Sequence, residues 1–202
     1  MPAPPLLSRV KAAGCFVMSS ATTVEEARWL EARGVDVIIA QGYEAGGHRA
    51  TFLGSDLNHA MASQSGTMAL LPQVVDAVSV PVIAAGGIAD GRSIAAAFAL
   101  GASGAQIGTA YLLCPEAATP PLHRDALRRA GANATVLTNV FTGRPAGAMV
   151  NRLIREVGPI ADAAPAFRDR RGSVSRLKSQ SRRALGPRSA LSEPECASQR
   201  FQ

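Results

Sequence analysis

One histidine, His48, stands out because it follows a glycine-rich turn at the end of an apolar segment. The turn covers residues 41–47 (Gln-Gly-Tyr-Glu-Ala-Gly-Gly) and comes directly after the apolar run 35–40. An apolar run of this length is typical of a buried parallel strand. Glycine lets backbone approach a ligand closely because it has no Cβ, and an imidazole can act as a base or a hydrogen-bond donor near neutral pH. We therefore expect His48 to carry the chemistry.

Two later strand ends repeat the glycine turn without a histidine. They are residues 84–88 (Ala-Ala-Gly-Gly-Ile) and residues 106–109 (Gln-Ile-Gly-Thr). Backbone N–H groups at such turns suit a phosphate, and the hydroxyl of Thr109 could add a donor. The three turns thus predict one shared ligand site that is lined mostly by backbone. The alternative, that these glycines only shape tight strand-to-helix turns, stays open at this point.

Strand and helix patterns alternate around these turns. Strands are expected at 15–20, 35–40, 80–85 and 105–107, and helices at 23–34, 67–78, 91–100, 109–113 and 123–130. Residues 1–7 read as an extended lead-in, 134–141 as an extended segment and 146–157 as a helix.

This alternation predicts an α/β fold of the (β/α)8 TIM-barrel type, with about four βα units in residues 1–164, as in the C-terminal half of a barrel. A Rossmann sheet is disfavoured because no Gly-x-Gly-x-x-Gly follows the first strand. The connection 51–66 is long for a βα loop, which suggests a lid or a binding loop.

The net charge of +6 lies entirely in residues 165–202, which hold nine basic and three acidic residues. Residues 1–164 hold twelve of each sign, so the body is neutral and gives no support for nucleic-acid binding. The tail is expected to be disordered, and its abrupt Arg/Ser-rich composition is what a frame-shifted reading would produce. No apolar run is long enough to span a membrane. Three widely spaced cysteines predict neither a metal site nor a disulfide, and hence a cytoplasmic protein.

Several segments together resemble nitronate monooxygenases, FMN-dependent barrel enzymes formerly called 2-nitropropane dioxygenases. The resemblance covers about residues 8–162 and is carried by residues 35–48, 71–78, 81–87, 104–116, 141–145 and 150–152. It implies that alkyl nitronates are oxidised with O2 to a carbonyl compound and nitrite, with His48 beside the reactive edge of the flavin. It further implies that FMN is bound by Gln41, Gly46, Gly87, Gln106, Ile107, Gly108 and Thr109, with Gly47 and Gly86 adjacent.

The resemblance also implies that the family's first barrel half is missing here, so we expect this chain alone to bind FMN weakly or not at all. Relatives usually carry a lysine that contacts the flavin where Phe16 stands. Two alternatives remain. One is an FMN-dependent NAD(P)H enoyl-thioester or quinone reductase on the same scaffold. The other is a non-catalytic half-barrel that self-associates through its open sheet edges.

Overall fold

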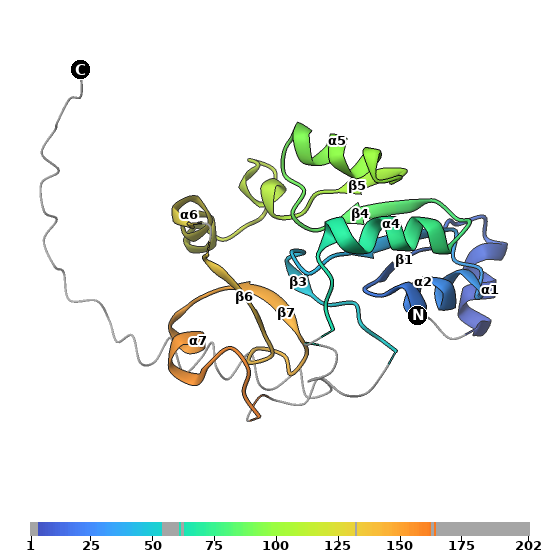
Figure 1. Cartoon of the computed structure of the whole chain (residues 1–202). Helices are drawn as coiled ribbons and strands as arrows, with labels where there is room; N and C mark the ends of the chain where they lie inside the picture. The colour runs from blue at the N-terminus through green and yellow to red at the C-terminus, as the bar shows by residue number, and fades with distance from the viewer. Residues whose placement is uncertain (1–3, 54–60, 62, 132, 163, 165–202) are drawn as a thin grey trace, which may run out of the picture.

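The structure is a computed structural model that describes residues 4–53, 61, 63–131, 133–162 and 164 (Figure 1). The predicted tail at 165–202 and residues 54–60 and 62 of the loop at 51–66 lie outside the described residues. None of the helices in the described part of the chain is long and apolar enough to cross a membrane.

The main sheet has four parallel strands in the order β1-β2-β4-β5. These strands are β1 (Met18–Ala21), β2 (Val37–Gln41), β4 (Val82–Ala85) and β5 (Gly104–Gln106). The predicted alternation of parallel strands and helices is confirmed, although the first strand begins three residues later than expected. Closure into a barrel and a domain boundary at residue 165 stay predictions.

Helices cover one face of this sheet and leave the other face to line a cavity. The helices are α2 (Val24–Glu31), α4 (Thr67–Ala77) and α5 (Gly91–Ala99). Ile38 and Ala84 point into the core beneath them, where Leu30 and Leu71 are fully buried. Because strand side chains alternate between faces, the intervening residues of the same strands point the opposite way. The central strands β2 and β4 are therefore largely apolar on both faces, whereas β1 and β5 carry Ser20 and Gln106.

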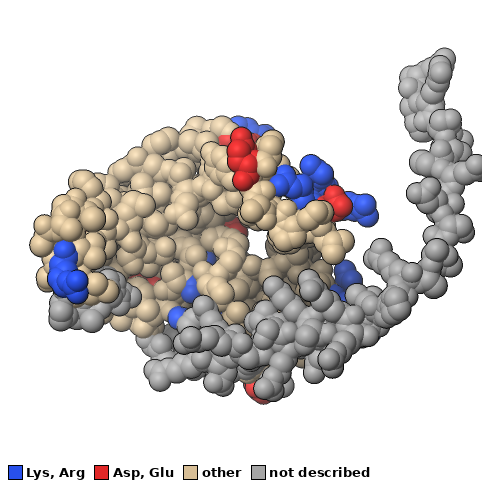
Figure 2. Space-filling view, turned by 180° about the vertical axis from the view of Figure 1, so that it is seen from behind, with Lys and Arg blue, Asp and Glu red and all other residues tan. Residues whose placement is uncertain are grey.

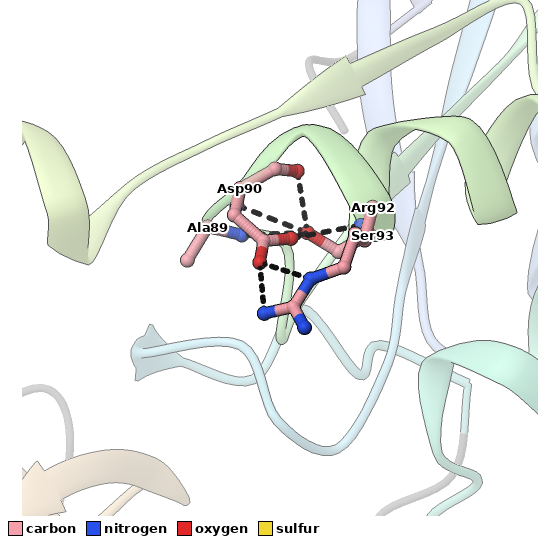
Figure 3. A network of polar contacts seen from close by, with 4 residues as sticks. All are labelled: Ala89, Asp90, Arg92 and Ser93. Carbon is pink, nitrogen blue, oxygen red and sulfur yellow. Dashed lines mark hydrogen bonds and ion pairs between the residues drawn. The ribbon is translucent and has the colours of Figure 1, made fainter.

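The start of α5 is fixed by a capping box directly after the glycine turn of β4 (Figure 3). The carboxylate of Asp90 accepts from the backbone N–H of Ser93 at 2.9 Å, and Ser93 Oγ accepts from the N–H groups of Asp90 and Ala89, each at 3.1 Å. Arg92 adds an exposed ion pair with Asp90 at 2.7 Å. The pKa of Asp90 lies below its ordinary value because of the Ser93 N–H and the Arg92 guanidinium. The capping box fixes the residues that directly follow the glycine turn of β4 and so restricts the conformation of that turn.

A second, smaller sheet is antiparallel and has the order β3-β7-β6. It consists of β3 (Gly47–His48), β6 (Thr135–Thr138) and β7 (Ala146–Met149). Gly47 lies opposite Gly147, and His48 lies opposite Ala146. Around it lie the 3-10 helix η1 (Thr109–Leu113) and the helices α6 (Pro121–Arg129) and α7 (Arg152–Val157).

The predicted helix at 146–157 is wrong in its first half, because residues 146–149 form β7. The sequence Ala-Gly-Ala-Met has no strong strand propensity, and its conformation comes from pairing with β3 and β6. The side chain of Asn151 then caps α7 by accepting from the N–H of Ile154 at 3.1 Å. Tertiary pairing overrides local preference here.

The extended lead-in expected at residues 1–7 is also wrong, because α1 (Pro4–Ala12) begins within it. Proline is tolerated in the first turn of a helix, where its missing N–H has no partner to lose. The helix is held by the buried side chain of Leu7 and by Lys11, which forms a 2.8 Å ion pair with Asp36.

Candidate functional site

A cavity of about 800 Å³ lies at the carboxyl ends of the parallel strands, with the small sheet and α6 on its other side. Every strand of the main sheet contributes to its wall, with Ser20 from β1, Ile39 and Gln41 from β2, Ala85 from β4 and Gln106 from β5. In the view from behind, an opening near the centre of the described surface is bordered mainly by uncharged residues (Figure 2). Cavities of this size commonly hold cofactors and small substrates.

Most of the predicted site residues meet at this cavity. Those that line it are Gln41, Gly46, Gly47, Gly86, Gly87, Gln106, Gly108 and Thr109. Ile107 does not, because its side chain packs against the hydrophobic core. His48 is exposed and lies next to the lining residue Gly47, outside the wall itself. Three turns that are far apart in sequence thus share one site.

Three glycines allow the 42–47 turn to fit between its neighbours. A Cβ at Gly42 would lie 2.0 Å from Oγ1 and 2.5 Å from Cα of Thr67. Gly86 has φ +117° and leaves no room for a Cβ beside the backbone N of Ala45, which would be 2.9 Å away. A Cβ at Gly147 would lie 2.9 Å from the carbonyl oxygen of Ala45. Helix α4, the β4 turn and β7 therefore contact the turn from three sides.

A carboxylate in the turn caps α4. Glu44 Oε2 accepts from the backbone N–H of Thr67 at 2.8 Å and from Thr67 Oγ1 at 2.9 Å. The residue before the helix, Gly66, has no side chain to do this. Negative charge at a helix N-terminus is favourable, so Glu44 ties the cavity wall to the helix. Sequence reasoning missed Glu44, although the missing cap before Thr67 was a signal.

His48 is oriented by a hydroxyl from a segment 94 residues away. Its Nε2 lies 2.9 Å from Oγ1 of Thr142. The Thr142 hydroxyl also lies 3.4 Å from the carbonyl oxygen of Arg144, to which it can donate. The Thr142 hydroxyl can accept from an Nε2–H group or donate to a bare Nε2, so the contact holds the ring in place with either tautomer. The ring therefore has a defined direction in this structure.

Two buried charges lie next to the turn. Glu26 is 1% exposed, and its two oxygens accept from the N–H and hydroxyl of Thr22 and from the N–H groups of Phe52 and Leu53. Arg49 is 2% exposed and follows His48 directly. Burial lowers the pKa of the Arg49 guanidinium, while the negative charges of Glu26 and Glu44 oppose that change. Neither residue was identified from the sequence.

The glycine turns offer room and unused donors to an anion. A Cβ at Gly108 would meet no atom within 4 Å, and one at Gly46 would lie 3.3 Å from the hydroxyl of Thr109. No hydrogen bond between described residues uses the backbone N–H of Gly87 or Gly108. No lysine or arginine from the described part of the chain lines the cavity. A phosphate here would be held by backbone and hydroxyl donors, so the residues fit a phosphate-bearing cofactor.

Sequence reasoning assigned no role to His123. This residue lies exposed on α6 and lines the cavity together with Leu127, one helical turn later. Phe16 was expected to replace a flavin contact. It is 84% exposed and precedes β1, so it lies at the opposite end of the strands from the cavity.

Comparisons with known proteins agree with one another. A sequence model of the nitronate monooxygenase family matches residues 1–188. The chain is 46% identical over 156 residues to a probable nitronate monooxygenase of Bacillus subtilis strain 168, covering 77% of this chain and 44% of that protein. It is 45% identical over 157 residues to a probable nitronate monooxygenase of Staphylococcus aureus strain Newman, covering 78% and 43%.

Solved structures give the same picture. A nitroalkane oxidase from Streptomyces ansochromogenes matches with a TM-score of 0.79 at 44% identity, covering 91% of this chain and 52% of that one. FabK from Thermotoga maritima is more distant, with a TM-score of 0.65 at 30% identity, covering 87% and 50%. The chain therefore spans about half the length of the relatives it matches.

Proposed function

The chain belongs to the nitronate monooxygenase family, and from this premise we propose that it carries the phosphate-binding turns and the histidine of an FMN-dependent site that oxidises alkyl nitronates. The observation that supports this most directly is the cavity where three glycine turns converge next to His48. The carbonyl compound and nitrite would be the products, and O2 the co-substrate.

The FMN phosphate would be held by the backbone N–H groups of Gly87 and Gly108 and by the hydroxyl of Thr109. These residues line the cavity, and the N–H groups of the two glycines have no hydrogen bond to other described residues. Gly46, Gly47 and Gly86 would leave room for the cofactor, with Gln41 and Gln106 at its sides. When bound, FMN would supply the one-electron oxidation of the nitronate, which O2 completes.

His48 would position and polarise the substrate. A nitronate is already a carbanion equivalent, so the site needs a hydrogen-bond donor to its oxygens more than a strong base. With Nε2 oriented by Thr142, the imidazole has a fixed direction. An imidazole can hold or release a proton near neutral pH, which suits both tasks.

The wall opposite the glycine turns favours a substrate with an uncharged carbon chain. Leu127, Val136, Leu137 and Met149 line it, and Glu44 is the one carboxylate among the described lining residues. Glu44 is already occupied by two hydrogen bonds from Thr67. An alkyl nitronate buries its chain against such a wall at about 0.8 kcal/mol per methylene.

The test is to measure FMN binding and turnover with the chain alone, and with the chain joined to the preceding half of the Bacillus subtilis relative. We expect weak or no FMN binding by the chain alone, and FMN-dependent O2 uptake and nitrite release with an alkyl nitronate by the joined form. NAD(P)H oxidation with an enoyl-thioester or a quinone, and no nitrite, would support the reductase instead. A folded protein that takes up no FMN in either form would show a non-catalytic scaffold.

A matched pair of variants locates the phosphate. Gly108→Val places a branched side chain in the open space of the cavity, whereas a Cβ at Gly131 meets no atom within 4 Å and lies outside the lining residues. We expect Gly108→Val to weaken FMN binding at an unchanged melting temperature and Gly131→Val to leave binding unchanged. Equal FMN affinity in both variants would place the phosphate elsewhere.

A further inference from the structure

We propose that Arg49 and Gln41 form a reciprocal clamp that positions His48, so that Arg49 is a positioning residue of this site. The Arg49 side chain binds the backbone at Gln41, and the Gln41 side chain binds the backbone on both sides of Arg49. His48 directly precedes Arg49 in the chain. The inference concerns the geometry of the imidazole and does not depend on the substrate.

Arg49 holds the end of strand β2. Its Nη2 donates to the carbonyl oxygen of Gln41 at 2.7 Å, its Nη1 donates to the carbonyl oxygen of Gly42, and its Nε donates to Oε1 of Gln64 at 2.6 Å. The carbonyl groups at the end of a parallel strand, where its regular pairing stops, need partners when they are buried. One guanidinium supplies the donors for two of them and fixes the direction in which the chain enters the 42–47 turn.

Gln41 holds the segment on either side of Arg49. Its Nε2 donates to the carbonyl oxygen of His48 at 3.0 Å, and its Oε1 accepts from the N–H of Ala50 at 2.8 Å. Gln41 thus accepts a hydrogen bond from Arg49 at its backbone carbonyl, and its side chain binds the backbone of the residues before and after Arg49. The contacts therefore join the two ends of the 42–47 turn to each other, directly before and after His48.

The requirement is for arginine rather than for any cation. All three acceptors of Arg49 are uncharged, so the contact is a fork of hydrogen bonds and not an ion pair. A lysine has one nitrogen at the end of a flexible stem and cannot reach three acceptors in different directions. The two nearby carboxylates, Glu26 and Glu44, are already hydrogen-bonded to other donors.

The clamp reaches the imidazole through the backbone of β3. The N–H of Arg49 donates to the carbonyl oxygen of Pro145 at 2.8 Å, directly before β7. His48 lies opposite Ala146 in the same pairing, and its Nε2 lies 2.9 Å from Thr142 Oγ1. If the Gln41–Ala50 segment relaxes, β3 shifts against β7 and the ring loses its partner on the 142–145 segment.

The test reads the His48 ring directly. The chain has three histidines, so ¹⁵N-labelled imidazole groups give three sets of NMR signals, and His48→Asn assigns the set of interest. Arg49→Lys removes the fork of hydrogen bonds from the guanidinium, and Gln41→Met removes the two hydrogen bonds of the Gln41 side chain. Arg124→Lys is the matched control, because Arg124 also donates to three backbone carbonyls, those of Leu113, Cys114 and Ala117, at a different place.

We expect both clamp variants to shift the signals of the His48 ring nitrogens and to leave those of His123 unchanged. Arg124→Lys should shift the His123 signals and leave the His48 signals unchanged, because Arg124 directly follows His123 in the chain. A merely structural role for Arg49 would lower the melting temperature of a variant and leave the His48 signals in place. Gln41→Met changes a half-buried residue, so it decides the question even if Arg49→Lys does not fold. Wild-type His48 signals in folded Gln41→Met would overturn the proposal.

Discussion

Replacing Gly42 by alanine tests whether the turn before His48 is as tightly held as the structure shows. The added Cβ would lie 2.0 Å from Thr67 Oγ1 and 2.5 Å from the backbone N and Cα of the same residue. Gly42 cannot easily retreat, because its N–H donates to Ala85 O at 2.9 Å and the next N–H donates to Ser65 O at 2.8 Å. The strain must therefore be shared between the turn and the start of α4.

Overpacking of this kind costs about 1–3 kcal/mol, and a contact this short belongs at the upper end of that range. For a chain of this size, ~3 kcal/mol corresponds to a fall in melting temperature of roughly 6–12 °C. Thermal unfolding followed by circular dichroism measures it. Gly131→Ala is the control, since a Cβ there meets no atom within 4 Å and should be neutral or slightly stabilising.

A second substitution shows which atoms resist the methyl group. Thr67→Ala removes the hydroxyl but leaves the backbone N and Cα, each 2.5 Å from the new Cβ. We therefore expect Gly42→Ala/Thr67→Ala to remain less stable than Thr67→Ala alone. The packing argument for this turn is refuted if Gly42→Ala has the wild-type melting temperature. It is also refuted if the double variant is as stable as Thr67→Ala alone.

Three further outcomes follow from the charges and the composition. The hydrogen bond from Lys11, with one from a backbone N–H, lowers the pKa of Asp36. The stabilisation of the fold by the ionised Asp36 should therefore be complete above about pH 4 and shrink as the pH falls further. In urea melts, the difference in unfolding free energy between the wild type and Asp36→Asn should narrow in acid and not in base. Glu26→Gln should lower the free energy of unfolding by at least ~1–3 kcal/mol, because the new amide NH2 group would face donors that need an acceptor. The control Glu25→Gln changes an exposed neighbouring residue and should cost almost nothing; equal losses in the two variants would contradict this. Deleting residues 168–202 should leave the melting curve unchanged, because their composition offers too little apolar surface to bury, and a clear loss of stability would show that they pack.

The parallel strands and the glycine turns could be predicted because their signals are local. Residues 37–40 (Val-Ile-Ile-Ala) are apolar at successive positions, and glycines directly follow the later segments 82–85 (Val-Ile-Ala-Ala) and 105–107 (Ala-Gln-Ile). Since carboxyl ends of neighbouring parallel strands meet, the convergence of residues 41–47, 86–87 and 106–109 followed from the order of elements. The structure brings these turns to one cavity.

The rest of the site depends on contacts that have no local signature. Residues 146–149 become a strand only through their partners in β3 and β6, and the role of Glu44 as a cap exists only once Thr67 reaches it. Arg49 looks like a surface cation in the sequence, yet it is 2% exposed because backbone carbonyls surround it. His123 was assigned no role because the position of α6, across the cavity from the main sheet, cannot be read from its own residues.

The pairing of β3 with β7 has a consequence for the order in which this molecule forms. The three glycine turns lie within residues 41–109, whereas Gly47 must find Gly147, one hundred residues later. Closing a flexible loop of that length costs on the order of 4 kcal/mol, and contacts so distant in sequence form slowly. We therefore expect a folding chain, or one emerging from a ribosome, to acquire its anion-binding turns first and the aligned imidazole last.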